Sequence, residues 1–219
     1  MPPEPNRATR LRTELAVAAA RLIAEEGCDY GLAKRRAVRE LLGEGADARG
    51  AMPDNAEVEH ELRRHLQLFE AETHPARLAG LRRIAADLMA RLSDFSPHLV
   101  GSVLGGTATA HSDIELHLFT DSAKDVEVFL LNAGIEFDAE PGEPSERPAP
   151  LERLSFLVAA PIPGAPRIGV RVHVYARDAI RVAPRHRAVS SVDFDLHPVA
   201  ASGRASLAAL RQLIADSAP

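Results

Sequence analysis

The sequence predicts an α+β protein in which an α-helical N-terminal region precedes a mixed sheet with helices on one face. Two observations support this prediction. Apolar residues recur at helical spacing through most of the first 92 residues. Beyond them, the segments follow the order strand, strand, helix, strand, strand, strand. We therefore expect an α-helical region over residues 1–94 and a sheet-containing core with a C-terminal helix over residues 95–219.

The composition limits the class of protein. The chain has 219 residues, of which 46% are hydrophobic, and this is enough for a substantial core. Its formal net charge of −5 argues against a general affinity for nucleic acid. The single cysteine, Cys28, excludes an internal disulfide and a cysteine-rich zinc site. The N-terminus does not read as a signal peptide, and no run approaches the length of a membrane span. We therefore expect a cytoplasmic protein with no membrane partner.

Four helices are expected in the N-terminal region, at residues 9–26, 32–42, 54–69 and 74–92. The third begins with Asp54 and has Glu57 three residues later, the spacing of a capping box. The second carries a basic face of Lys34, Arg35, Arg36 and Arg39. This face either binds a polyanion such as RNA or is a solvated surface that pairs with nearby glutamates. The second interpretation is the commoner one for helical charge runs.

The second half begins with two strand-like runs around a turn of small residues. The first run is apolar over 99–104 and is interrupted by Gly101-Ser102, and the turn covers 105–112. The second run alternates over 113–118, which places Ile114, Leu116 and Leu118 inside. Further elements are expected as a helix ending near 132, a strand at 135–138, a hairpin of strands at 151–159 and 167–176, and a closing helix at 203–215.

Asp113 and Glu115 are the candidate reactive groups. Side chains two residues apart on a strand share a face, so these carboxylates lie side by side and repel each other. Such a pair makes chemical sense mainly when a divalent cation lies between its members. Gly101 allows close approach to the backbone, and Ser102 offers a hydroxyl and an amide to a phosphate. The plainer alternative is an ordinary hairpin loop followed by a solvated outer face.

This stretch resembles the signature of the DNA polymerase β-like nucleotidyltransferase superfamily. A hydrophobic residue precedes Gly101-Ser102, ten residues intervene, and residues 113–116 read Asp-Ile-Glu-Leu. The inner residues 106–108 and Ser112 are also similar to those of small bacterial members. The resemblance implies a nucleotidyltransferase-like sheet and transfer of a nucleoside monophosphate from a nucleoside triphosphate to a hydroxyl, with Mg²⁺ or Mn²⁺. It implies Asp113 and Glu115 as metal-binding and catalytic residues, and Gly101, Ser102, Thr107 and Ser112 as nucleotide-binding residues.

One part of the superfamily pattern is missing. Active members usually carry a third carboxylate on a later strand, and here that strand reads Ile-Gly-Val-Arg-Val-His-Val-Tyr over 168–175. Arg171 or His173 is therefore expected where the carboxylate would be, and His173 becomes the third candidate catalytic residue. Asp178, Asp193 and Asp195 are possible substitutes, although a role in turns or at a solvated edge suits them better.

Two functions follow from this pattern. The first is a nucleotidyltransferase whose acceptor is a small molecule, a protein or RNA. The second is a nucleotidyltransferase-like protein that has lost catalysis and binds a nucleotide or a partner protein. The chain contains no Gly-x-x-x-x-Gly-Lys-Ser/Thr motif, which argues against a P-loop kinase or ligase.

Overall fold

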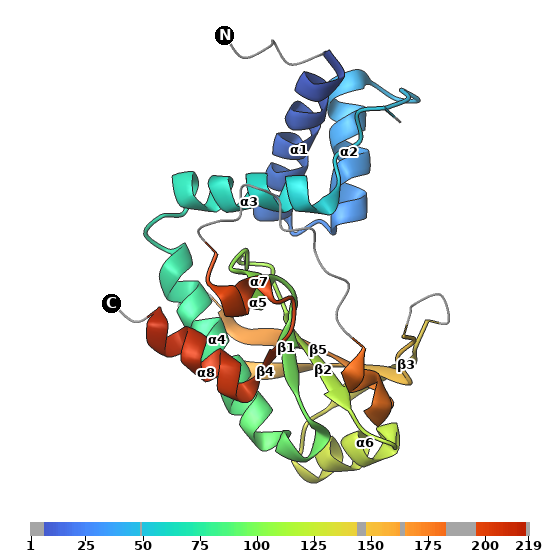
Figure 1. Cartoon of the computed structure of the whole chain (residues 1–219), viewed down its shortest axis with the longest axis vertical. Coiled ribbons are helices and arrows are strands. Elements are labelled where there is room, and N and C mark those ends of the chain that lie inside the picture. Colours follow the sequence, from blue (N-terminus) through green and yellow to red (C-terminus); the bar gives the residue numbers. More distant parts are fainter. Residues whose placement is uncertain (1–6, 49, 144–147, 163–164, 183–195, 218–219) are drawn as a thin grey trace. The chain divides into compact units, whose positions relative to one another are not determined.

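The structure is a computed structural model that describes residues 7–48, 50–143, 148–162, 165–182 and 196–217 (Figure 1). Within these residues the fold is α+β, with an open mixed sheet of six strands. The chain divides into two compact units. A helical unit extends to His74 and includes the short stretch Thr109–His111, and a sheet unit contains the elements from α4 onward. None of the described helices is both long enough and apolar enough to cross a membrane.

Three helices build the helical unit: α1 (Arg7–Glu26), α2 (Tyr30–Leu42) and α3 (Asn55–Phe69). All three lie where the hydrophobic periodicity predicts them. Asp54 accepts a hydrogen bond from the Glu57 amide, and the Glu57 side chain accepts one from the Asp54 amide, which confirms the predicted capping box. Leu15 and Leu22 of α1 and Leu62 of α3 are among the fully buried side chains of a small core.

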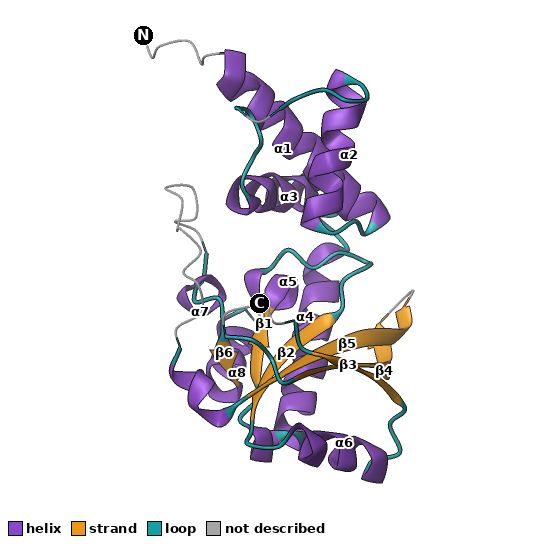
Figure 2. Cartoon of the chain, turned by 90° about the vertical axis from the view of Figure 1, so that its right-hand side faces the viewer, coloured by secondary structure: helices purple, strands orange, loops and turns teal. Residues whose placement is uncertain are grey.

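The six strands pair in the order β3-β4-β5-β2-β1-β6 (Figure 2). β2 and β5 are parallel, and every other neighbouring pair is antiparallel. β4 and β5 form the predicted hairpin. The strands are β1 (His98–Val100), β2 (Ile114–Phe119), β3 (Phe137–Pro141), β4 (Glu152–Ile162), β5 (Ala165–Tyr175) and β6 (Ala205–Ser206).

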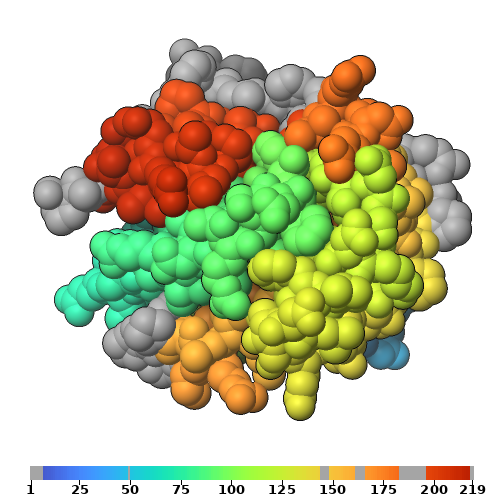
Figure 3. Space-filling model, turned by 90° about the horizontal axis from the view of Figure 1, so that it is seen from below, coloured from blue at the N-terminus to red at the C-terminus, as the bar shows by residue number. Residues whose placement is uncertain are grey.

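One face of the sheet packs against helices α4 (His74–Arg91), α6 (Ala123–Asn132) and α8 (Leu207–Asp216). The core of this unit contains Ile114, Leu116 and Leu118, as the alternation predicts. The 3₁₀ helix η1 (Ser93–Phe95) follows α4, and Phe95 meets Phe129 of α6 edge-on at a centroid distance of 5.7 Å. In Figure 3, the red part of the chain that contains α8 adjoins a green part, which in turn adjoins the yellow-green part that contains α6. The polar members of β2 and β5 therefore lie on the opposite face, which we call the open face.

Two expectations about local structure need correction. Val103 and Leu104 do not continue a strand, because they belong to a short helix, α5 (Gly101–Gly105). Gly101 has φ +71°, which ends the extended backbone after Val100. The closing helix begins at Leu207 and not at Gly203, because the short helix α7 (Pro198–Ala201) and strand β6 precede it. The 3₁₀ helix η2 (Arg177–Arg181) follows β5.

Candidate functional site

Gly101 and Ser102 begin α5 directly after β1. Val100 lies opposite Glu115 in the antiparallel pair of β1 and β2, so the Gly-Ser step lies at the level of Asp113. A Cβ on Gly101 would lie 2.7 Å from Oε2 of Glu115. Glycine is therefore required at this position both by its backbone conformation and by the neighbouring carboxylate.

Arg82 on α4 fixes the other end of α5. Its side chain is only 7% exposed, and its Nε and Nη2 donate to the carbonyl oxygens of Val103 and Leu104 at 3.1 and 3.0 Å. Burial lowers the pKa of Arg82 to about 10, so the guanidinium is charged at neutral pH. A cation at a helix C-terminus complements the free carbonyl groups there. Arg82 thus holds the helix whose first residues are Gly101 and Ser102.

Asp113, directly before β2, pairs with Arg171 of β5. Nε of Arg171 donates to Oδ2 of Asp113 at 2.7 Å. The hydrogen bond and charge of Asp113 raise the pKa of Arg171, although partial burial opposes this rise. Gly169 leaves room for the carboxylate, because a Cβ there would collide with Oδ1 of Asp113. A positive charge therefore already lies beside one of the two candidate metal ligands.

Glu115 lies on the same open face, in register with Arg171. Burial raises its pKa, the charge of Arg171 opposes that rise, and the negative charge of Asp113 adds to it. The structure thus confirms the predicted juxtaposition of Asp113 and Glu115. It also shows that Arg171, and not His173, is the residue opposite Glu115.

These residues do not fit a two-metal site. Two carboxylates are available, and Asp113 is already neutralised by the guanidinium of Arg171. Within the described residues, no cluster of three or more His, Cys, Asp or Glu side chains is arranged to hold a metal ion. Asp178 is exposed on η2, beyond the far end of β5 from Gly169, while Asp193 and Asp195 lie outside the described residues. The requirement for Mg²⁺ or Mn²⁺ therefore stays a prediction.

The other predicted nucleotide-binding residues lie in and after the turn that follows α5. Ser102 and Ser112 are half-buried. Thr107 is only 1% exposed, and its hydroxyl has no hydrogen-bond partner among the described residues. Its amide donates to the Ser102 carbonyl at 2.9 Å. Thr107 therefore closes the turn through its backbone, and a contact between its hydroxyl and a ligand would require the turn to open.

His173 belongs to a row of three imidazoles across neighbouring strands. It lies in register with His117 of β2, which in turn lies in register with His98 of β1. The rings of His117 and His173 are stacked, with an interplanar angle of 18° and a centroid distance of 5.7 Å. Burial, with the charges of His173, Arg204 and His98, lowers the pKa of His117 to about 3. We call His98, His117 and His173 the imidazole row.

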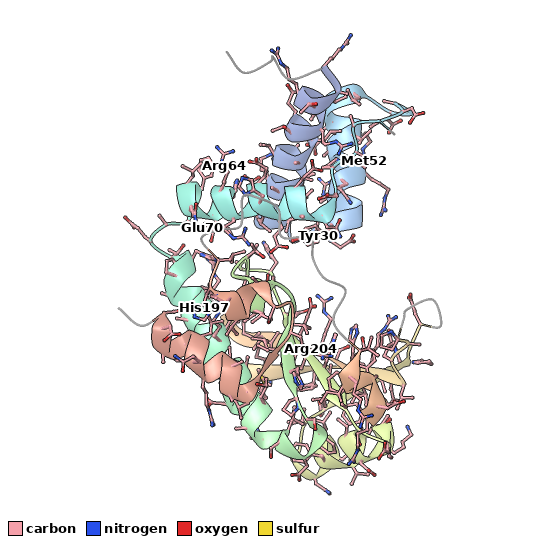
Figure 4. All side chains as sticks on the ribbon, viewed as in Figure 1. Tyr30, Met52, Arg64, Glu70, His197 and Arg204 are labelled. Carbon is pink, nitrogen blue, oxygen red and sulfur yellow. The ribbon has the colours of Figure 1, made fainter. Side chains whose placement is uncertain are left out.

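Aromatic rings and an arginine continue the open face beyond the imidazole row. Phe119 and Tyr175 are stacked at a centroid distance of 5.7 Å and form a small cluster with Ala179 of η2. Arg204, labelled in Figure 4, lies over the Phe119 ring at 5.2 Å and donates to the Ile180 carbonyl at 2.7 Å. The face therefore changes along the strands from charged groups to imidazoles and then to buried aromatic rings.

The basic face of α2 divides into two kinds of residue. Arg36 pairs with Glu26 at 2.5 Å, and Lys34 donates to the Asn55 side chain at 2.8 Å. Arg35 and Arg39 instead line a cavity of about 730 Å³ within the helical unit, together with Val38, Ala48 and Met52. The glutamate pairing expected of a solvated face thus holds for Arg36.

Two residues of the site were not identified from the sequence. Gly169 had a possible signal, because an isolated glycine inside a strand often marks close approach by another group. Arg82 had none, since an arginine in an amphipathic helix normally faces solvent. No family model, curated protein or solved structure matches this chain, so the assignment of the site depends on its residues and their geometry.

Proposed function

We propose that the sheet unit is a nucleotide-binding module of the nucleotidyltransferase type, in which Arg171 acts in place of a divalent cation. The observation that carries this proposal is the 2.7 Å hydrogen bond between Nε of Arg171 and Oδ2 of Asp113. In a metal-dependent site, the cation joins carboxylates to phosphate oxygens. A guanidinium can make the same connection, because it donates from one edge to a carboxylate and from another to a phosphate.

The geometry of Arg171 suits this role. The Arg171 side chain is 55% exposed, so a phosphate can reach it. Within the described residues, Asp113 is hydrogen-bonded to Nε of Arg171 and not to its two terminal nitrogens. Burial raises the pKa of Glu115, and the charge of Arg171 beside it opposes that rise. Ser102 at the start of α5 lies at the same end of β2 and supplies further donors. A nucleoside triphosphate is the ligand that this combination favours.

Nucleotidyl transfer to an unidentified hydroxyl is the second candidate function. Asp113 directly before β2 and Glu115 on it, next to a Gly-Ser step, favour nucleotidyl transfer. Displacing Arg171 would cost little, because an exposed ion pair contributes at most about 1 kcal/mol. This function needs an Mg²⁺-dependent nucleotide complex, whereas the binding function does not.

Calorimetric titration of the full chain with ATP, GTP, CTP and UTP separates the two functions, in buffer that contains either EDTA or Mg²⁺. We expect at least one nucleotide to bind in EDTA, and we expect Arg171→Ala to weaken that binding about tenfold or more. Arg171→Lys should recover part of the affinity, because it retains charge but not the fork of donors. Arg167→Ala is the matched control, since it removes another exposed arginine from β5.

Binding that appears only with Mg²⁺ and disappears in Asp113→Ala would contradict the arginine bridge and favour nucleotidyl transfer. The absence of binding under both conditions would contradict both functions.

A further inference from the structure

The imidazole row is an unusual surface for the open face of a sheet. Its three members come from β1, β2 and β5, and all three are half-buried, so each retains exposed area. His117 and His173 stack on each other, and His117 also lies 4.8 Å from the Tyr175 ring. The rings are thus held in place by their neighbours.

The position of the row relative to the phosphate-binding residues is set by the strand register. His117 follows Glu115 by two residues on β2, and His173 follows Arg171 by two residues on β5. Two residues along a strand correspond to roughly 7 Å. The imidazole row is thus the next layer of the open face after the Arg171 and Glu115 layer, on the side away from Gly101.

Phe119 and Tyr175 close the far side of the row. They are 3% and 6% exposed, and Arg204 and η2 hold them in place. A ligand that begins at Ser102 and Arg171 and extends along the strands therefore reaches half-buried imidazoles before it meets buried rings. Planar heterocycles stack on such side chains, with a contribution of about 1–3 kcal/mol per base.

We propose that the imidazole row is the binding site for the nucleobase, so that a nucleotide lies along the open face with its phosphates at Ser102 and Arg171. This inference rests on the proposed function and adds to it the part of the ligand that each layer of the face recognises. The row also predicts a preference for purines over pyrimidines, because a larger base covers more of the π surface.

The test compares three ligands by calorimetry in EDTA: ATP, inorganic tripolyphosphate and adenosine. We expect wild-type protein to bind ATP roughly 5- to 150-fold more tightly than tripolyphosphate, the range that stacking of one base supplies. His173→Ala should reduce ATP affinity to the level of tripolyphosphate and leave tripolyphosphate binding unchanged. His173→Phe should still bind ATP more tightly than tripolyphosphate, because phenylalanine retains an aromatic ring.

His65→Ala is the matched control, because His65 forms another imidazole–aromatic contact, with Phe69 of α3, at a centroid distance of 4.7 Å. It should leave all three affinities unchanged. NMR of the histidine side chains in wild-type protein gives a second readout that does not depend on a stable variant. The resonances of His117 and His173 should shift with ATP and much less with tripolyphosphate.

Two results overturn the inference in distinguishable ways. If ATP and tripolyphosphate bind equally well and His173→Ala changes neither, the row has a structural role only and the phosphate site stands. If neither ligand binds, the inference fails together with the proposed function.

Discussion

The helical unit and the sheet unit carry their charges in opposite ways. In the helical unit, Arg21 pairs with Glu25 and Glu40, and Arg36 pairs with Glu26, on the outside of the helices. In the sheet unit, Arg82 and Glu115 are withdrawn from water and have pKa values shifted by burial. Surface ion pairs contribute little to the free energy of folding, because their charges stay hydrated. Buried charges lower stability through desolvation, so their retention suggests a role beyond stability.

Perturbed titratable groups concentrate at functional sites. In the sheet unit, Arg82, Glu115 and Arg171 are shifted groups that lie around α5 and on the adjoining open face. In the helical unit, the shifted groups Glu26 and Arg36 form a salt bridge with each other. The contrast supports the proposal that the sheet unit contains the nucleotide-binding site. Substitutions in the two units should differ in how much they change stability and in whether they change ligand binding. Four predictions test this difference.

The largest effect is expected from Arg82→Met, which removes both hydrogen bonds to the α5 carbonyl groups. Hydrogen bonds from a charged donor contribute about 1.5–3 kcal/mol each, part of which is offset by relief of burial, so we expect a net loss of about 3 kcal/mol. Urea unfolding monitored by circular dichroism measures it. Arg83→Met changes the exposed neighbour and should cost less than about 0.5 kcal/mol. Equal losses in the two variants would contradict the assignment of Arg82.

Gly101→Ala should cost about 2 kcal/mol, from left-handed backbone strain and from crowding of Glu115. Gly134→Ala is a matched control, because Gly134 has φ +67° and a Cβ there would meet no atom within 4 Å. The difference between the two losses in free energy of unfolding isolates the crowding. Only Gly101→Ala should also weaken nucleotide binding.

Glu115→Gln should stabilise the protein at neutral pH. The gain in free energy of unfolding should be smaller than the losses expected for Arg82→Met and Gly101→Ala. The pKa of Glu115 in the folded state is raised above its ordinary value of 4.5, so its contribution to stability falls as the pH rises from about 4.5 through the folded-state pKa. Glutamine does not titrate, and the gain should therefore shrink as the pH is lowered toward 4. Melting temperatures between pH 4 and 8 measure this, with Glu140→Gln on the exposed strand β3 as the control. A gain that does not change with pH would contradict a buried, charged Glu115.

The smallest effect is expected in the helical unit. Arg21→Ala removes two exposed ion pairs, at 3.2 and 3.0 Å, and should cost only a few tenths of a kcal/mol. High salt should reduce even that difference, because exposed charges are screened. Chemical unfolding with and without 1 M NaCl tests this, and a loss comparable with that of Arg82→Met would remove the contrast between the units.

The sequence predicts those features that depend on local pattern. Hydrophobic periodicity identifies the long helices, and alternation places Asp113, directly before β2, on the same face as Glu115 of that strand. Residues 101–104 are misread as part of a strand, because a few apolar residues carry no distinct period and the backbone angle of Gly101 is not visible in sequence.

The open face itself depends on the register between strands that are distant in the sequence. A shift in the pairing of β2 with β5 would place a residue other than Arg171 opposite Glu115. It would also move His173 away from His117, so the imidazole row would not form. Alternation limits the third position to Arg171 or His173, but only the paired strands distinguish the two. The same holds for Gly169, whose role follows from where Asp113 lies in space.

The most direct test of the arginine bridge is the ATP affinity of wild-type protein and of Arg171→Asp, measured by calorimetry over a range of Mg²⁺ concentrations. We predict that wild-type binding is nearly independent of Mg²⁺. We also predict that Arg171→Asp, with three carboxylates and no guanidinium, binds ATP only when Mg²⁺ is present. Wild-type binding that requires Mg²⁺, or Arg171→Asp that binds ATP in EDTA as well as wild type does, would contradict the arginine bridge.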